Sequence, residues 1–211
     1  HRPLRFCHVT ANITSGIARA FERIAKGLNE EQKESMANKL YEKSVIVFID
    51  CMRKKDCWWT GAVNNWRSMI CGEMGTAVLA FKEYIPEYRE ALRYCIEGIF
   101  DVLDNQPEDG SALEGMSYWF PTVGHSVEFA QALYIETKGE LNLFEHPYLK
   151  KTGYFMICGI QPGHLNFNYF DNSINLNLKS AVTMGILALR QDEPYYCEYY
   201  SNMIPSDIES L

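Results

Sequence analysis

The chain has 211 residues, 47% of them hydrophobic and 22% charged, which is the balance of a globular protein with room for one large or two small domains. The formal net charge of −7 argues against nucleic acid as a partner. No stretch approaches the ~20 apolar residues of a membrane-spanning helix, so we expect no membrane partner.

The chain begins without Met, and no apolar signal-peptide core follows residues 1–4. We therefore expect a fragment or processed product of a longer protein, for which the missing signal leaves export open. The seven cysteines are scattered and contain no CxxC pair, which disfavours a zinc site. Cys71 and Cys95 fall in apolar helical stretches and are expected to be buried thiols. Cys51 and Cys57 flank a Lys-rich turn, and whether they pair stays open.

Apolar residues recur at helical spacing along most of the chain and predict about seven helices in an all-α fold. The stripes that we expect to face inward are Ile13, Ile17, Phe21 and Ile24; Met36, Leu40, Val47 and Cys51; Ile70, Met74, Ala77, Val78 and Phe81; Leu92, Ile96, Ile99 and Leu103; Val123, Val127, Ala130 and Tyr134; and Leu178, Val182, Ile186 and Leu189. Antiparallel hairpins of such helices build a helical barrel or an α-solenoid.

Several helix boundaries carry their own signals. The expected ones are an N-cap at Asn29, an N-cap at Asn64 or Asn65, an end at Arg53-Lys54-Lys55, an end at Gly139 and a start at His146-Pro147. Gly72 and Gly75 lie inside a predicted helix, where glycine costs ~1 kcal/mol relative to alanine. They therefore predict close approach of a second helix.

Three long polar-aromatic loops, residues 57–66, 105–118 and 161–175, join the predicted helices, and we expect them to meet on one face. Such mixtures of aromatic rings, amides and acids are typical of a sugar-binding cleft, because sugars offer apolar faces for stacking and hydroxyls for hydrogen bonds. The candidate residues are Trp58, Trp59, Trp66 and Trp119 for stacking, Asn64 and Asn65 as amides, Tyr118 as a phenol, Glu114 and Asp171 as acids, and His125 and His164 as imidazoles.

The second loop contains the stretch that organises the site, Asp109-Gly110-Ser111 followed by Glu114-Gly115 and then Tyr118. Its two glycines predict a corner where the backbone bends sharply and presents side chains to a cavity. The simpler interpretation is a connection between helices with a tyrosine packed in the core.

These motifs resemble the heparinase II/III-like polysaccharide lyases. Asn64-Asn65-Trp66 is similar to the amide-bearing segment of that family, and Asp109-Gly110, Glu114-Gly115 and Tyr118 are similar to its DG…EG…Y segment. The His146-Pro147-Tyr148-Leu149-Lys150 run, Pro162-Gly163 and Asp171-Asn172-Ser173 also resemble the helical domain of dermatan-sulfate epimerase. The resemblance covers roughly residues 60–190, in order.

The resemblance implies that residues 1–211 form a single incomplete (α/α) toroid, normally followed by a β-sandwich domain that this chain lacks. It implies β-elimination or C5 epimerisation of a uronic acid in an acidic polysaccharide, by a secreted or periplasmic protein. Asn65 would neutralise the substrate carboxylate, with Asn64 as the neighbouring alternative, and Tyr118 would be the catalytic tyrosine. Family members use a second histidine from the end of the toroid or beyond it.

His125, two helical turns after Tyr118, is expected either to contact the sugar and tune the phenol or to pack within the bundle. The five histidines show no metal-binding spacing, so we expect no metal and no cofactor. Arg53, Lys54, Lys55 and Arg67 flank the first loop and are expected to supply a local positive field. A lyase is our first expectation; a uronyl C5-epimerase, a non-catalytic glycan-binding domain and an inverting glycoside hydrolase using Glu114 and Asp171 are the alternatives.

Overall fold

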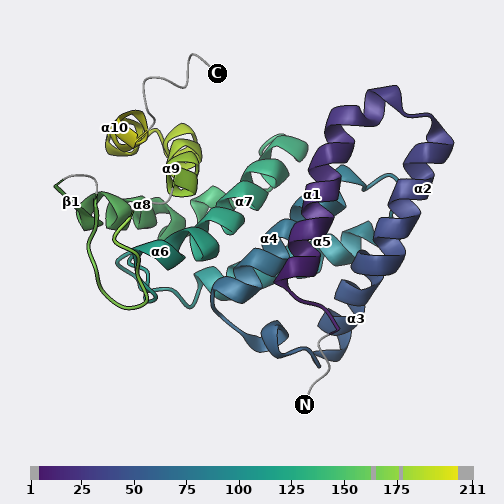
Figure 1. Ribbon diagram of the computed structural model, residues 1–211, viewed down its shortest axis with the longest axis horizontal. Coiled ribbons are helices and arrows are strands. Elements are labelled where there is room, and N and C mark those ends of the chain that lie inside the picture. The colour runs from purple at the N-terminus through teal and green to yellow at the C-terminus, as the bar shows by residue number, and fades with distance from the viewer. Residues whose placement is uncertain (1–4, 163–164, 176–177, 204–211) are drawn as a thin grey trace.

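The computed structural model describes residues 5–162, 165–175 and 178–203, and this part of the chain is mostly helical, so the all-α prediction is confirmed (Figure 1). The helices are α1 (His8–Ile24), α2 (Glu30–Leu40), α3 (Ile46–Lys54), α4 (Asn65–Ala80), α5 (Tyr88–Leu103), α6 (Met116–Trp119), α7 (His125–Glu136), α8 (Pro147–Gly159), α9 (Leu178–Gln191) and α10 (Pro194–Met203). Two short strands, β1 (Ile160–Gln161) and β2 (Leu165–Asn166), form an antiparallel hairpin that the sequence did not predict.

Helix α4 is the centre of the fold and packs against α1, α5 and α7 (Figure 1). A Cβ added at Gly72 would lie 2.5 Å from the backbone oxygen of His125, and one at Gly75 would lie 2.4 Å from the ring of Phe129. Both neighbours belong to α7, so the prediction that these glycines admit a second helix is confirmed. The glycines thereby fix how closely α7 approaches the helix that begins at Asn65.

Local signals placed most helix ends correctly. Asn29 caps α2 and forms a capping box with Gln32, and Asn64 caps α4 by accepting a hydrogen bond from the backbone N–H of Trp66. Helix α3 ends at Lys54, followed by Lys55 in a left-handed conformation. Gly139 has the positive φ of 88° expected beyond a helix end.

The predicted inward face of α1 is wrong. Ile13, Ile17 and Ile24 are 59%, 41% and 49% exposed, and the only member of the predicted stripe that is buried is Phe21. The buried side chains of α1 are instead mostly small, namely Ala11, Thr14, Ser15, Ala18 and Phe21. Small residues let α1 lie close against α4, and that close packing outweighs the burial of the larger isoleucines.

The prediction for α9 fails in the same way. Val182 and Leu189 are 53% and 70% exposed, whereas Met184 and Leu187 are fully buried. The buried face of α9 meets α10, a helix that the sequence did not predict. Tyr196 of α10 is fully buried, and its hydroxyl donates to the backbone oxygen of Lys150.

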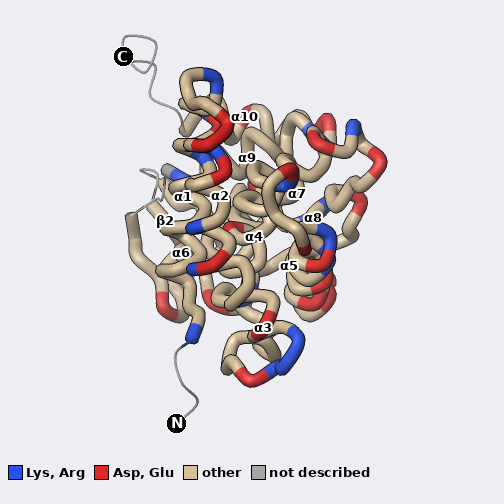
Figure 2. The backbone as a smooth tube through the Cα atoms, turned by 90° about the vertical axis from the view of Figure 1, so that its right-hand side faces the viewer, with Lys and Arg blue, Asp and Glu red and all other residues tan. Residues whose placement is uncertain are grey.

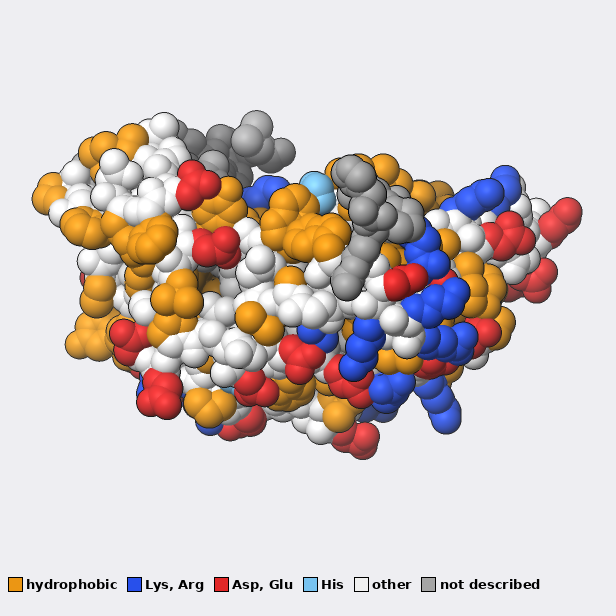
Figure 3. Space-filling view, turned by 90° about the horizontal axis from the view of Figure 1, so that it is seen from below, with side chains coloured by type: hydrophobic (Ala, Val, Ile, Leu, Met, Phe, Trp, Pro, Cys, Tyr) orange, Lys and Arg blue, Asp and Glu red, His pale blue; other side chains and the backbone are white. Residues whose placement is uncertain are grey.

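Charged residues of both signs alternate over the tube in Figure 2 and do not form one extended patch. In the face shown in Figure 3, basic side chains gather on the side of α2 and α3, hydrophobic side chains are prominent on the opposite side, and acidic side chains lie on both. No helix in residues 5–162, 165–175 and 178–203 is long and apolar enough to cross a bilayer.

Candidate functional site

A cleft of about 480 Å³ opens where the start of α4 meets α1, α6 and the loop after β2. Its lining residues are His8, Asn65, Trp66, Met69, Glu114, Tyr118, Pro121, Phe170 and Asp171. The three predicted polar-aromatic loops therefore each contribute to one cleft. Asn65 and Tyr118, the two residues expected to act on the sugar, line it together.

Adjacent asparagines at the start of α4 have different tasks. The Asn64 side chain is occupied as the N-cap and does not line the cleft. Asn65, at 5% exposure, does line it, and its Oδ1 atom is buried without a hydrogen-bond partner. Because an unpaired buried polar atom is costly, this oxygen has acceptor capacity that a donor group of a ligand can use.

The glycine corner brings Glu114 and Tyr118 to this amide. Gly110 and Gly115 have φ angles of 87° and 90°, a region that other residues rarely adopt. A Cβ at Gly115 would also lie 2.9 Å from the backbone oxygen of Tyr169, so the corner packs directly on the third loop. The corner prediction is thus confirmed as a backbone feature.

The side chain of Asn172 anchors the third loop to the segment that follows Gly115. Its Oδ1 accepts hydrogen bonds from the backbone N–H and the hydroxyl of Ser117, at 2.8 Å and 2.5 Å. The Ser117 hydroxyl also accepts from the backbone N–H of Ser173 at 2.8 Å. These bonds hold the neighbouring Asp171 beside Tyr118.

Tyr118 and the two acids form one electrostatic unit. The Tyr118 hydroxyl donates to Asp171, and this hydrogen bond, with the charge of Asp171, raises the pKa of the phenol above its usual value. Burial raises the pKa of Glu114, which accepts a hydrogen bond from the backbone N–H of Asn65, and the charge of Asp171 raises it further. The pKa of Tyr118 is thus shifted away from neutrality, whereas a tyrosine that transfers protons is expected to need a lowered pKa, so this expectation is not met.

His8 and Phe170 also line the cleft, and sequence reasoning did not select them. His8 is the first residue of α1; its ring lies edge-on against Trp66, with centroids 4.4 Å apart, and its Nδ1 atom is buried without a partner. Phe170 is 79% exposed and has a φ of 56°. No local pattern marks His8, because its place depends on how α1 packs against α4.

Two of the four candidate stacking tryptophans belong to the core. Trp59 and Trp119 are fully buried, and their Nε1 atoms donate to the backbone oxygen of Phe6 and to the hydroxyl of Thr152. Their assignment as substrate-binding residues is therefore wrong in this structure. Trp66 lines the cleft, and Trp58, 44% exposed, packs edge-on against it with centroids 5.4 Å apart.

His125 faces a second groove of about 690 Å³, which shares Met69 and Pro121 with the cleft. Its Nδ1 atom lies 2.8 Å from Oε1 of Glu73. Arg19 lies 3.6 Å from Glu73 and 2.8 Å from Glu128. His125 is thus engaged with a buried acid on the far side of Met69, and the other candidate imidazole, His164, lies outside the described residues.

The expected positive field around the first loop is largely cancelled by ion pairs. Arg53 pairs with Glu90, Lys54 with Asp50, and Arg67, which is buried, with Asp101. Neither these three cations nor Lys55 line the cleft. Its acids, Glu114 and Asp171, leave the cleft itself with acidic character.

A group of possible metal ligands consists of Cys51 in α3 and Asp56 and Cys57 on the loop that follows it, and none of the three lines the cleft. Comparison with known proteins adds no identity to these observations: no family model matches the chain, and no curated protein matches it. The function must therefore be argued from the cleft.

Proposed function

We propose that this chain is the helical (α/α) toroid domain of a secreted or periplasmic uronic-acid polysaccharide lyase. The observation that carries the proposal is that Asn65 and Tyr118 line one cleft, together with Glu114 and Asp171. A volume of about 480 Å³ suits a small number of sugar rings. The expected β-sandwich domain is part of the same proposal.

Elimination begins with removal of the C5 proton, which is weakly acidic while the adjacent carboxylate is charged. The Nδ2 group of Asn65 would donate to that carboxylate and stabilise the negative charge that develops on it. The unpaired Oδ1 would accept from a sugar hydroxyl. Trp66 and Phe170 would hold the apolar face of the sugar in place of the buried Trp59 and Trp119. The amide thus acts on the reacting group, and the aromatic rings orient the sugar.

Two groups in the cleft can move protons. An imidazole exchanges protons readily at neutral pH, so His8 is the residue that we propose takes the C5 proton. The bond from C4 to its glycosidic oxygen then breaks, its electron pair leaves with the oxygen, and the electrons of the C5–H bond form the C4=C5 double bond. The phenol of Tyr118, which is protonated at neutral pH, would give its proton to the departing oxygen.

One observation favours a second candidate, an inverting glycoside hydrolase. Glu114 has a raised pKa, as a general acid requires, and the exposed Asp171 remains as the base that activates water. The negative character of the cleft, which opposes an anionic substrate, also fits this reaction better. Hydrolysis would break the glycosidic bond without forming a double bond.

The test is to incubate the full-length protein with heparin, heparan sulfate, chondroitin, dermatan sulfate and alginate. A lyase yields products whose new double bond absorbs ultraviolet light, with one new reducing end for each. Reducing ends without this absorbance would establish the hydrolase. An epimerase would give neither, but would exchange the C5 hydrogen with deuterium from solvent, and binding without any of these changes would leave a non-catalytic glycan-binding domain.

A further inference from the structure

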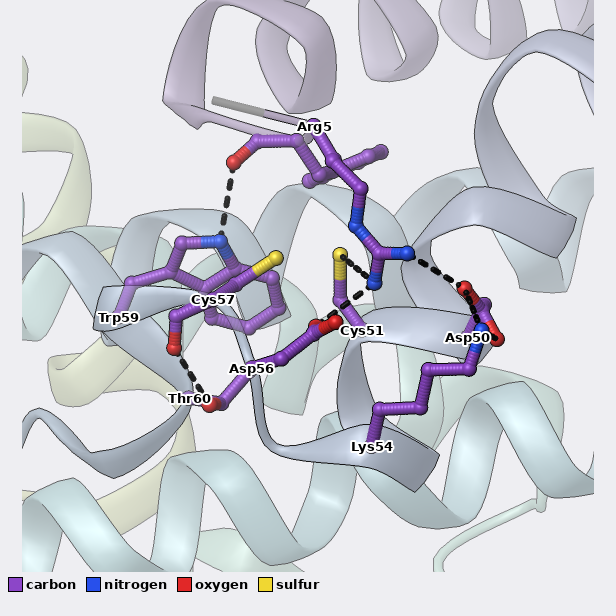
Figure 4. Close-up of polar contacts among 9 residues, drawn as sticks. Arg5, Asp50, Cys51, Lys54, Asp56, Cys57, Trp59 and Thr60 are labelled. Atoms are coloured by element: carbon purple, nitrogen blue, oxygen red, sulfur yellow. Dashed lines mark hydrogen bonds and ion pairs between the residues drawn. The ribbon is translucent and has the colours of Figure 1, made fainter. Parts of the chain in front are cut away.

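Cys51 and Cys57 lie side by side at the base of the first loop. Their Sγ atoms, together with a carboxylate oxygen of Asp56, lie within 4.8 Å of one another (Figure 4). Both side chains are buried, at 0% and 3% exposure, and both are thiols in this structure. They come from different local elements, since Cys51 belongs to α3 and Cys57 follows its end.

The backbone between them is shaped to bring them together. The N–H of Lys55 donates to the backbone oxygen of Cys51 at 2.9 Å, and Lys55 has a φ of 50°, which reverses the chain direction. Beyond the turn, the hydroxyl of Thr60 donates to the backbone oxygen of Cys57 at 2.7 Å. Both ends of this short loop are therefore held in position without a covalent link.

We propose that Cys51 and Cys57 form a disulfide when the protein folds in an oxidising compartment. The oxidant is a disulfide of low molecular weight, of the glutathione type. The Cys51 thiolate attacks the oxidant, forms a mixed disulfide and releases one thiol. The Cys57 thiolate then attacks the sulfur of Cys51 and releases the second thiol, so two electrons pass to the oxidant and two protons leave the cysteines.

Arg5 lies beside the two thiols and affects the ionisation of Cys51. Its guanidinium lies 3.8 Å from the Sγ of Cys51 and 2.6 Å from Oδ1 of Asp56, and it also binds Asp50 at 2.9 Å (Figure 4). Burial and the neighbouring Cys57 raise the pKa of the Cys51 thiol to about 12. The guanidinium of Arg5 acts in the opposite direction and favours the thiolate that exchange requires.

A metal ion fits the same residues less well. Zinc in structural sites is held by four ligands, and this group supplies three. The guanidinium of Arg5, already bonded to Asp56, would stand beside the ion with a charge of the same sign. Two adjacent buried thiols can form a disulfide without any further ligand.

The bond would fasten one wall of the candidate cleft. The indole of Trp59, two residues after Cys57, donates to the backbone oxygen of Phe6, and His8 follows Phe6 by two residues. Fixing the loop therefore helps to fix the segment that leads to His8. The disulfide itself is independent of which reaction the cleft performs.

The experiment uses the full chain, refolded with reduced and oxidised glutathione and alkylated without further reduction. Arg53, Lys54 and Lys55 are trypsin sites between the two cysteines, so the disulfide would join two peptides that reduction separates. Reduction should lower the melting temperature by about 5 °C, the shift expected for opening so short a loop in a chain of this size. The C51S/C57S variant should lose this response, and the C158S/C197S control, which changes two exposed cysteines, should retain it.

The proposal is overturned if Cys51 and Cys57 are both alkylated in the refolded protein and reductant leaves its melting temperature unchanged. It is also overturned, in favour of a metal site, if Zn²⁺ raises the melting temperature of the reduced protein and the D56N variant abolishes that rise. The peptide map needs no substitution, so the test holds even if a variant fails to fold.

Discussion

The cleft beside Tyr118 and the groove beside His125 share Met69 and Pro121 as a common wall, but their charged residues differ in environment. In the groove, Glu73 is surrounded by Arg19, Ser15 and His125, and these partners hold the pKa of its carboxyl below the usual range despite its burial. The stability of the ionised form comes from groups within the protein itself.

In the cleft, by contrast, some polar atoms keep unused hydrogen-bonding capacity. The buried Oδ1 of Asn65 and Nδ1 of His8 have no hydrogen-bond partner, and the pKa of Glu114 is raised. The Nδ1 atom of His125 in the groove also lacks a hydrogen bond of good geometry, but it lies 2.8 Å from the carboxylate of Glu73. Unpaired polar atoms and groups with shifted pKa values destabilise the fold, and ligand binding can offset this cost. Such groups are therefore found more often at functional sites. This contrast supports the proposal that the cleft binds a ligand, whereas the groups of the groove stabilise the fold.

The largest expected effect is that of Tyr118→Phe on catalysis. Loss of the phenolic proton donor should lower kcat/KM by ~10²–10⁴-fold, while the ring still packs and the melting temperature changes little. Steady-state kinetics on the polysaccharide that serves as substrate would measure this loss. Tyr148→Phe is the matched control, because its hydroxyl donates to the backbone oxygen of Ser111 and should affect stability alone. Near-normal turnover of Tyr118→Phe would remove Tyr118 from the mechanism.

Next in size is the contrast between two adjacent asparagines. Asn65→Ala should lower kcat by ~10²–10³-fold and weaken binding, because it removes the amide proposed to bind the carboxylate. Asn64→Ala removes the cap of α4 and should cost ~0.5–2 kcal/mol of stability with little change in kcat per folded molecule. Kinetics and thermal melts of both variants would separate the roles. Equal losses of kcat in the two variants would show that activity depends on the start of α4 as a whole and not on the Asn65 amide.

In the groove, Glu73→Gln should destabilise the fold by ~1–3 kcal/mol, because Arg19 and His125 lose a buried charged partner. Because folding lowers the pKa of Glu73, its carboxylate stabilises the fold fully at pH values above its pKa in the unfolded chain, near 4.5. This stabilisation is lost as the pH falls through the lower pKa of the folded state. Urea unfolding from pH 6 down to about pH 3 should therefore show the deficit of the variant shrinking below pH ~4.5. Glu128→Gln, a change at a more exposed acid, should cost less than ~1 kcal/mol.

The smallest expected effect is the opposite pH trend at Glu114. Because the pKa of Glu114 is raised, the folded state favours the protonated acid. The contribution of Glu114 to stability is therefore full at pH values below its pKa in the unfolded chain, and it is lost as the pH rises through its pKa in the folded state. Glu114→Gln, which imitates the protonated form, should gain stability relative to the natural chain as pH rises from 4 to 7. Parallel pH trends for the Glu73 and Glu114 variants would contradict the contrast between the two regions.

Within the site, sequence reasoning selected five residues that line one cleft, namely Asn65, Trp66, Glu114, Tyr118 and Asp171. It chose them from motifs whose geometry is largely local, such as a cap, a positive-φ glycine or a turn. It failed for Trp59 and Trp119, because a loop tryptophan that packs inward has the same neighbours in sequence as one that faces a cleft. The aromatic Phe170 was missed for the corresponding reason.

The amino-acid sequence by itself determined the helical class, the cap at Asn29 and a cap at Asn64 or Asn65, because each depends on backbone conformation within a few residues. Gly72 and Gly75 also predicted the close approach of a second helix, and the structure showed that this helix is α7. Only the tertiary structure decided which faces of α1 and α9 are buried, since two opposite faces of these helices each carry apolar side chains and their neighbours select one. The position of His8 follows from that choice: α1 packs against α4 through its small residues, and this contact carries the imidazole to the cleft.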